Sequence, residues 1–214
     1  MTTQSFNPRT GEAFGPEIAD TSASQVEAII DKAVAAFEKW SSATEAERAA
    51  ALIGIADALD ANSTALVEIA DLETGLGVPR LTGEVGRTTF QLREFARTLI
   101  DGRFTNSEVD AFSDAPLPAG HPELIRSLTP LGVVVVFGAN NFPFAFSVLG
   151  GDTASALAAG CAVIAKAHPS HPQTSNQVFA LRAIFRARSG CLTLFKPSIV
   201  LITANFRNSF SFSE

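Results

Sequence analysis

Apolar residues recur at helical spacing through the first half of this chain. The first predicted helix spans residues 24–40, with Ser24 and Glu27 forming the pattern of a capping box at its start. Thr44 and Glu47 repeat this pattern before a second helix. The apolar face of the first helix comprises Val26, Ile29, Ile30, Ala33, Val34, Phe37 and Trp40. Because these positions are three or four residues apart, the sequence predicts that this face is buried.

Two further helices continue the pattern. The third begins at Asn62 or Ser63. Gly75 and Gly77 end it, because glycine readily adopts the left-handed backbone that follows a helix. The fourth follows Pro79, and its inward residues are Leu81, Val85, Leu92, Phe95 and Leu99. The first half of the chain therefore predicts a layer of helices.

The pattern changes after the fourth helix. Prolines, a glycine and short polar runs over residues 103–128 predict a loop or ribbon, with a possible strand at Leu124–Leu128. A run of β-branched residues then predicts a strand over 132–137. A helix near 144–159 and a strand over 161–166 follow. This order predicts a β-α-β unit, in which the two strands are parallel.

The last part of the chain has weaker signals. Ser175 can cap a further helix that runs to about residue 188. Residues 191–195 and 198–202 are short apolar runs that can form strands. Residues 205–214 contain phenylalanines without helical or strand periodicity. The elements together predict an α/β fold.

Composition limits the classes of function. The chain has 214 residues, of which 46% are hydrophobic and 18% charged, so a folded core is expected. A net charge of −6 gives no support to nucleic-acid or membrane-surface binding. The N-terminus lacks the basic and apolar regions of a signal peptide. Cys161 and Cys191 lie in apolar runs and are expected to be reduced thiols, which favours a cytoplasmic location.

Two polar residues lie at the carboxyl ends of the predicted parallel strands. This is the sheet edge where ligands bind in open α/β folds. The Asn141 amide can donate a hydrogen bond to an oxyanion that forms on a carbonyl carbon, or it can close a turn by bonding its own backbone. The Lys166 ammonium can reach ribose hydroxyls or a phosphate, or it can extend into solvent at a strand end. No Gly-x-Gly-x-x-Gly follows the first strand, so the common dinucleotide fingerprint is absent.

Other candidates are weaker. His168 and His171 are three residues apart, but prolines follow each of them, and no cysteine or carboxylate cluster lies nearby, so no metal site is expected. Cys161 begins a buried strand and is expected to pack as a small apolar residue. Cys191 has no neighbouring cation that would lower the pKa of its thiol, so it is a poor nucleophile candidate.

The run from Pro130 to Pro143, Pro-Leu-Gly-Val-Val-Val-Val-Phe-Gly-Ala-Asn-Asn-Phe-Pro, is followed by Ala-Leu-Ala-Ala-Gly-Cys-Ala-Val-Ile-Ala-Lys, which ends at Lys166. Together these runs resemble the aldehyde dehydrogenase superfamily. Residues 83–93 and 166–172 resemble its α-ketoglutaric semialdehyde (2,5-dioxovalerate) dehydrogenase branch.

The likeness extends over about residues 5–188. It implies that residues 1–102 form the helical part of a cofactor-binding domain. Residues 103–128 would be a connecting loop or ribbon, and residues 129–188 would supply the β-α-β part of an incomplete Rossmann-like parallel sheet. Residues 189–214 depart from the family and are expected to be a divergent tail produced by truncation or a frameshift.

The resemblance also implies an activity, the NAD(P)-dependent oxidation of a small aldehyde, with 2,5-dioxopentanoate as the expected substrate. Asn141 would stabilise the oxyanion formed when a cysteine thiolate attacks the aldehyde, and Lys166 would hold the adenine ribose. Phe137 and Gly138 would line the nicotinamide through their backbone. Pro169 replaces a ribose-binding glutamate of many members, and the loss of that carboxylate removes repulsion against a 2′-phosphate, so the expected cofactor is NADP or NAD. Full-length relatives would be homo-oligomers.

Three expectations stay open at this stage. The nucleophilic cysteine loop and the catalytic glutamate of the family are not found, and Cys191 matches neither, so the chain alone is predicted to be inactive. A non-catalytic nucleotide-binding or interaction module is the alternative. Arg87, Gln91 and Arg93 lie on a helix near the substrate channel of relatives, and any of them can meet a substrate carboxylate.

Overall fold

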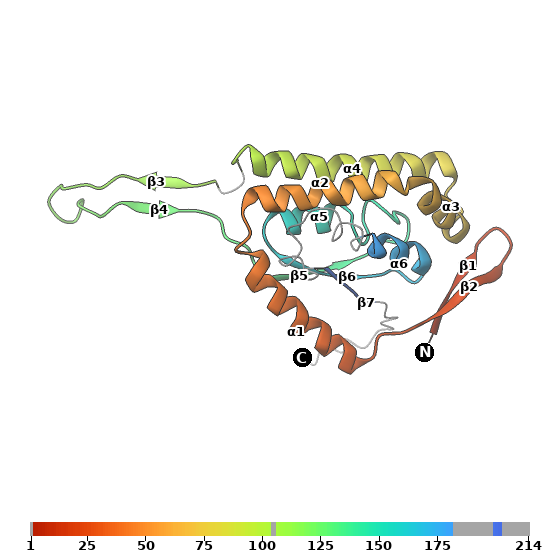
Figure 1. The fold of residues 1–214 in the computed structure, drawn as a ribbon. Helices are drawn as coiled ribbons and strands as arrows, with labels where there is room; N and C mark the ends of the chain where they lie inside the picture. Colours follow the sequence, from red (N-terminus) through yellow and green to blue (C-terminus); the bar gives the residue numbers. More distant parts are fainter. Residues whose placement is uncertain (1, 104–105, 182–198, 203–214) are drawn as a thin grey trace.

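A parallel sheet with helices on both of its faces forms the centre of the chain (Figure 1). This computed structural model describes residues 2–103, 106–181 and 199–202. The sheet has the strand order β5-β6-β7 within the described residues, and both neighbouring pairs are parallel. Its strands are β5 (Val133–Phe137), β6 (Ala162–Lys166) and β7 (Ile199–Ile202). The predicted β-α-β unit is therefore confirmed, and β7 lies where the run 198–202 predicts a strand.

The helices divide between the two faces of the sheet. Helix α1 packs on one face, while α5 covers the other face and separates it from α2 and α4, which lie side by side (Figure 1). Trp40, the last residue of α1, donates a hydrogen bond of 3.0 Å from its indole Nε1 to the carbonyl of Leu157 in α5. The helices are α1 (Ala23–Trp40), α2 (Glu45–Ala61), α3 (Ser63–Thr74), α4 (Val78–Ile100), α5 (Gly151–Ala158) and α6 (Pro172–Ala180).

Two predictions about α1 are wrong. Its capping box is made by Ser22 and Gln25 rather than by Ser24 and Glu27. Glutamine at the third helical position bonds the cap backbone as well as glutamate does, so the helix can begin two residues earlier. Ile30 and Val34 are also 45% and 49% exposed. The sheet contacts a narrower stripe of α1 than the apolar face predicts.

The predictions for α2, α3 and α4 agree better with the structure. Thr44 and Glu47 form a capping box at the start of α2, and the two hydrogen bonds from Thr44 lower the pKa of the Glu47 carboxyl. Gly75 ends α3 in the left-handed conformation, with φ of 67°. Gly77 has φ of 92° but precedes α4 instead of ending α3. The inward residues predicted for α4 are buried, apart from Phe95, which is half-buried.

Two antiparallel ribbons extend from this body. The hairpin of β1 (Thr2–Asn7) and β2 (Glu12–Ala19) was not predicted, because a register shift and an interior glycine interrupt its alternation. The ribbon of β3 (Glu108–Asp110) and β4 (Leu124–Arg126) confirms the prediction for residues 103–128 and projects away from the sheet (Figure 1).

The predicted helix over 144–159 is shorter in the structure. Helix α5 begins at Gly151, and the preceding residues form a bent loop. Gly150 is the residue just before this helix. An added Cβ at Gly150 would lie 2.3 Å from the carbonyl oxygen of Ala145, so close packing requires glycine there. Helix α6 begins at Pro172, three residues before the predicted cap.

Some predictions fall on parts of the chain that the structure does not describe. These are the end of the helix over 182–188, the strand over 191–195, Cys191 and the irregular run 205–214. In the described residues no single helix is long and apolar enough to cross a bilayer. Helices α2 and α3 meet such a test of length and composition only as a pair bent by 71°.

Candidate active site

The loop that follows β5 carries the polar residues predicted to act in chemistry. The backbone N–H of Gly138 donates to the carbonyl of Lys166 at the end of β6, at 2.9 Å. Ala139 donates to the carbonyl of Phe146 at 2.8 Å, which closes the loop around Asn141. A Cβ at Gly138 would lie 3.0 Å from Ser147 Oγ and 3.2 Å from the Lys166 carbonyl. Glycine thus lets the two strands and the loop meet closely.

One stripe of α4 holds this loop. Arg80 donates from Nη2 to the carbonyl of Asn141 at 2.8 Å, and its guanidinium lies 5.2 Å from the ring centre of Phe142. The Arg87 guanidinium lies 5.0 Å from the ring centre of Phe146. The two rings meet edge to face at 5.2 Å. Such cation–π and aromatic contacts hold the loop after β5 against α4.

Glu84, between these arginines on the same stripe, is buried. Its Oε1 accepts hydrogen bonds from the backbone N–H groups of Phe144 and Ala145, at 2.8 and 2.9 Å. Its Oε2 is buried and has no hydrogen-bond partner among the described residues. The sequence analysis did not single out Glu84. A signal was available, because Glu84 lies on the same face as the apolar Leu81 and Leu92 rather than on the polar face.

Asn141 itself is exposed, and its side-chain amide makes no hydrogen bond among the described residues. Only its backbone carbonyl is bonded, to Arg80. The alternative in which the Asn141 side chain closes its own turn is therefore not what the structure has. The turn is closed by Glu84 and Arg80, and the amide is left available to a ligand.

Lys166 lies directly beside Phe137, its partner in the parallel ladder. Its side chain is partly buried, and burial lowers the pKa of the ammonium, an effect that the nearby negative charge of Asp20 partly opposes. Lys166 makes no ion pair among the described residues. The Phe137 ring is 70% exposed. The structure therefore brings together Phe137, Gly138 and Lys166 at one edge of the sheet, with Asn141 on the loop that leaves it.

The turn between β6 and α6 contacts the same loop. His171 is fully buried, and its Nε2 donates to the carbonyl of Ala139 at 2.8 Å, while its Nδ1 lies 3.1 Å from Ser175 Oγ. His168 stacks on His171 with a ring distance of 5.6 Å. Burial lowers the pKa of His168 to about 4, and the charges of His171 and Lys166 contribute. Both histidines thus have structural contacts, and no cluster of three metal-binding side chains occurs in the described residues.

Glu73 of α3 holds the start of α6. Its Oε1 accepts from the Gln173 backbone N–H at 2.8 Å and from the Ser5 hydroxyl. Its Oε2 accepts from the backbone N–H and the hydroxyl of Thr174, at 2.8 and 2.6 Å. A carboxylate is well placed there, because the first N–H groups of a helix have no partner within the helix. Glu73 therefore joins β1, α3 and α6.

The structure separates the three candidates for a substrate carboxylate. Arg93 pairs with Asp57 and Asp60 of α2 at 2.7 and 2.8 Å, and these carboxylates raise the pKa of its guanidinium. Arg93 therefore holds α2 against α4. The Gln91 side chain faces Gly151, with Oε1 3.1 Å from the position of an added Cβ. Arg87 is exposed beside the Asn141 loop.

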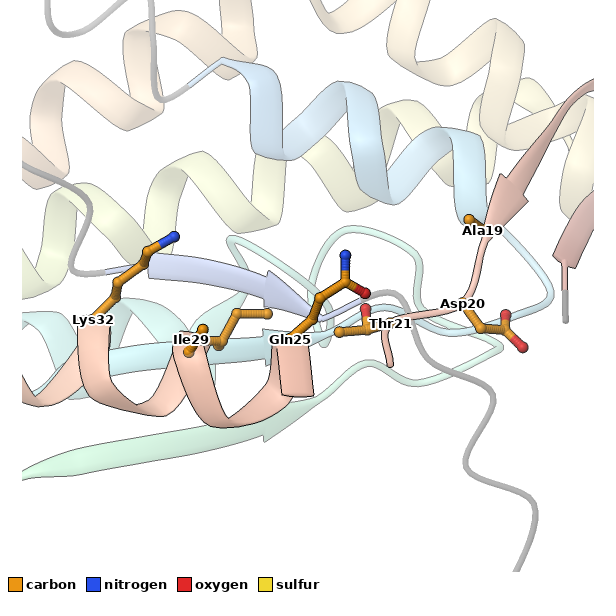
Figure 2. Close-up of a pocket in the computed structure, with 7 residues that line it drawn as sticks. Ala19, Asp20, Thr21, Gln25, Ile29 and Lys32 are labelled. Carbon is orange, nitrogen blue, oxygen red and sulfur yellow. The ribbon is translucent and has the colours of Figure 1, made fainter. Parts of the chain in front are cut away.

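A pocket of about 350 Å³ lies between the end of β2 and the first turns of α1 (Figure 2). Gln25 in its wall accepts the cap hydrogen bond from the Ser22 N–H at 2.8 Å, and Asp20 accepts from the Thr3 hydroxyl at 3.1 Å. These two polar groups serve the protein itself, and the Asn141 loop does not line the pocket. The lining residues are Ala19, Asp20, Thr21, Gln25, Ala28, Ile29 and Lys32.

Comparison with known proteins decides the family. The model of the aldehyde dehydrogenase family matches residues 1–188. The chain belongs to the aldehyde dehydrogenase family. Among curated relatives, this aldehyde dehydrogenase chain is 48% identical over 178 residues to alpha-ketoglutaric semialdehyde dehydrogenase 2 of Azospirillum brasilense. It is 39% identical over 177 residues to an alpha-ketoglutaric semialdehyde dehydrogenase of Acinetobacter baylyi. The resemblance to this branch is confirmed.

Solved aldehyde dehydrogenases share the fold. The chain matches one from Brucella melitensis with a TM-score of 0.79 and 24% identity, over 96% of this chain and 39% of that one. It matches a betaine aldehyde dehydrogenase of Staphylococcus aureus, solved in complex with NAD+, with a TM-score of 0.77 and 25% identity. That match covers 95% of this chain and 38% of the other. The predicted α/β fold class is therefore confirmed.

This chain aligns with only part of each of the two curated semialdehyde dehydrogenases. Each of the two semialdehyde dehydrogenases matches 83% of this chain, but the match spans only 34% of the relative. The chain thus spans about a third of the length of the curated relatives that it matches.

Proposed function

We propose that this chain supplies the oxyanion donor and part of the cofactor edge of an NAD(P)-dependent aldehyde dehydrogenase. The proposed reaction oxidises 2,5-dioxopentanoate to 2-oxoglutarate. The names of two relatives, at 48% and 39% identity, support this substrate, since both are alpha-ketoglutaric semialdehyde dehydrogenases. Further relatives act, by their names, on the semialdehydes of aspartate and succinate. An aldehyde that also carries a carboxylate is the class they share.

The observation that carries this proposal is the fixed backbone of Asn141 together with its side-chain amide, which makes no hydrogen bond within the described ranges. The loop is held by Arg80 and Glu84, so the backbone that carries the amide donor is already in place when an oxyanion forms. In acyl-transfer enzymes one donor of this kind contributes about 2.7–4 kcal/mol to transition-state stabilisation. The contribution arises only once a nucleophile has attacked, because it acts on the charge formed in that step.

The sheet edge fits a nicotinamide dinucleotide. Lys166 presents a partly buried ammonium without an ion pair among the described residues, which suits ribose hydroxyls or a phosphate. Phe137 and Gly138 would lie along the nicotinamide at the adjacent strand end. When bound, the dinucleotide would accept a hydride. We propose NADP or NAD as the cofactor. Pro169 replaces the ribose-binding glutamate of many members, so no carboxylate at that position would repel a 2′-phosphate.

We further propose that these 214 residues do not oxidise the aldehyde by themselves. The thiolate of an aldehyde dehydrogenase must reach the substrate. Cys161 is only 2% exposed at the start of β6, which excludes it as that nucleophile in the folded chain. Cys191, the other cysteine, lies outside the described residues and matches no nucleophile loop of the family.

The test adds NAD+ or NADP+ and 2,5-dioxopentanoate to the purified chain and follows the appearance of reduced cofactor. We expect no turnover in either case. Turnover that is lost in Cys191→Ser would contradict the proposed inactivity, and it would identify a nucleophile within this chain.

A second candidate function, a nucleotide-binding module without catalysis, rests on Lys166, which makes no ion pair within the part of the chain that the structure describes. Titration with NADP+ separates the two, since a module binds in a saturable way and loses affinity in Lys166→Ala. Lys39→Ala is the matched control, because Lys39 is exposed at the last turn of α1. Absence of binding by the wild-type chain would remove the cofactor part of the proposal.

A further inference from the structure

Arg87 differs from the other described arginines of α4. Arg93 and Arg97 pair with carboxylates of Asp57, Asp60 and Glu94, and Arg80 donates to the carbonyl of Asn141. Arg87 is exposed and makes no ion pair among the residues that the structure describes. Its guanidinium lies over the Phe146 ring, 5.0 Å from the ring centre.

The position of Arg87 is set by aromatic contacts that lead to Asn141. The steps from Arg87 to the Phe146 ring and from there to the Phe142 ring are 5.0 and 5.2 Å. The guanidinium is therefore within about 10 Å of the residue that follows Asn141. A guanidinium stacked on a ring keeps its N–H edge free, and that edge matches a carboxylate with two parallel hydrogen bonds.

Within the described ranges, no acidic side chain forms an ion pair with Arg87. Glu84 is one turn earlier on α4, but it is buried and its Oε1 faces the N–H groups of Phe144 and Ala145. Gln91, one turn later, is neutral and faces Gly151. In a chain with a net charge of −6, an exposed cation held in one place beside the candidate site is a specific feature.

We propose that Arg87 binds the carboxylate of an oxo acid whose aldehyde carbon lies at the Asn141 amide. The rings of Phe142 and Phe146 would contact the short carbon chain between the two ends. This assignment rests on the proposed function for the role of Asn141, while the carboxylate contact itself depends only on Arg87. Arg87 would thus select aldehydes that carry an acid group over neutral aldehydes of the same length.

The test is a binding experiment on the whole chain, with glutarate as a five-carbon dicarboxylate probe and its dimethyl ester as the neutral counterpart. Side-chain and ring NMR signals of Arg87, Phe142 and Phe146 are followed during each titration. We expect saturable shifts with glutarate and none with the ester. In Arg87→Gln the affinity for glutarate should fall by roughly tenfold, as expected for one lost charge-assisted pair.

Arg97→Gln is the matched control, because Arg97 is an exposed arginine of the same helix. It removes the same net charge but should leave glutarate binding unchanged. Both sites are exposed, so the amide spectra of the variants should show an intact fold. The proposal is overturned if the wild-type chain does not bind glutarate, if Arg87→Gln binds it equally well, or if both variants lose the same affinity.

A second titration, with NADP+, distinguishes failure of this inference from failure of the proposed function. Glutarate shifts at Arg87 without any NADP+ shifts at Lys166 would keep the carboxylate site and reject the cofactor edge. NADP+ shifts without glutarate binding would reject the carboxylate site alone.

Discussion

Glu73 and Glu84 are both buried glutamates on helices, and each accepts two backbone N–H groups from a distant segment. They differ in their second oxygen. Both Glu73 oxygens are fully used, and the Ser5 and Thr174 hydroxyls add to the backbone donors. Glu84 uses only Oε1, and its Oε2 has no partner among the described residues. Unmet buried acceptors are uncommon in native proteins and often occur near functional sites.

The comparison suggests different tasks for the two carboxylates. Glu73 completes a joint between β1, α3 and α6, in which every available lone-pair direction contributes to stability. Glu84 shapes the loop that carries Asn141 at the cost of one unsatisfied oxygen. We expect the second arrangement to stabilise the fold less than the first, and it lies next to the residue for which a chemical role is proposed.

Glutamine at the two positions should give the largest contrast. In Glu73→Gln the new NH2 group replaces an oxygen that accepts from two donors, so we expect a loss of about 2–4 kcal/mol in the free energy of unfolding. In Glu84→Gln the NH2 can take the place of the unpartnered Oε2, and the loss should stay within about 1 kcal/mol. Urea unfolding measures both, with the exposed Glu68→Gln of α3 as the control. Equal losses would contradict the comparison.

The end of the Asn141 loop, which Glu84 holds, should not tolerate a larger side chain at Gly150. A Cβ there would lie 2.3 Å from the Ala145 carbonyl oxygen, which is rigid backbone held by Glu84. We expect Gly150→Ala to lower stability by about 1–3 kcal/mol and to speed amide exchange at Ala145. Gly86→Ala is the control, since its Cβ meets nothing within 4 Å and alanine favours the helix. If Gly150→Ala changes neither the stability nor the amide exchange at Ala145, the loop is less rigid than the contact with Glu84 implies.

The smallest expected effect concerns His168, in the turn between β6 and α6. Burial holds the pKa of His168 at about 4, below the ordinary value of 6.5. Between these values the unfolded chain takes up a proton that the folded chain does not, so stability falls as the pH falls from 6.5 toward 4. His168→Asn should flatten this part of the stability-against-pH curve. An unchanged slope in the variant would show that His168 does not couple to folding.

The sequence predicted most elements whose signals are local. Thr44 and Glu47 cap α2 because both partners lie within four residues. The cap of α1 was misplaced because Ser22 and Gln25 offer an equivalent pattern two residues earlier. The β1–β2 hairpin was missed because most of its residues are exposed, so burial imposes little alternation on them.

The contacts of Glu84 and Glu73, the two glutamates that hold the Asn141 loop and the start of α6, could not be predicted from local signals. Glu84 bonds residues 60 and 61 positions away, and Glu73 bonds residues 100 and 101 positions away. Acidic residues in helices usually face solvent, so the place of Glu84 on an apolar face is a signal of burial, but only the tertiary structure shows which N–H groups the two glutamates bind. The same bonds explain why the helix predicted from residue 144 begins only at Gly151, since Glu84 holds the backbone of Phe144 and Ala145 in a turn.

The contact between Trp40 and Leu157 also makes the chain its own optical reporter. The sequence contains one tryptophan and no tyrosine, so near-ultraviolet emission arises almost entirely from this indole. The indole is buried and bonded to the α5 backbone across the edge of the sheet. A red shift of its emission would therefore mark the moment when α1 leaves α5, without any label and at a single known position.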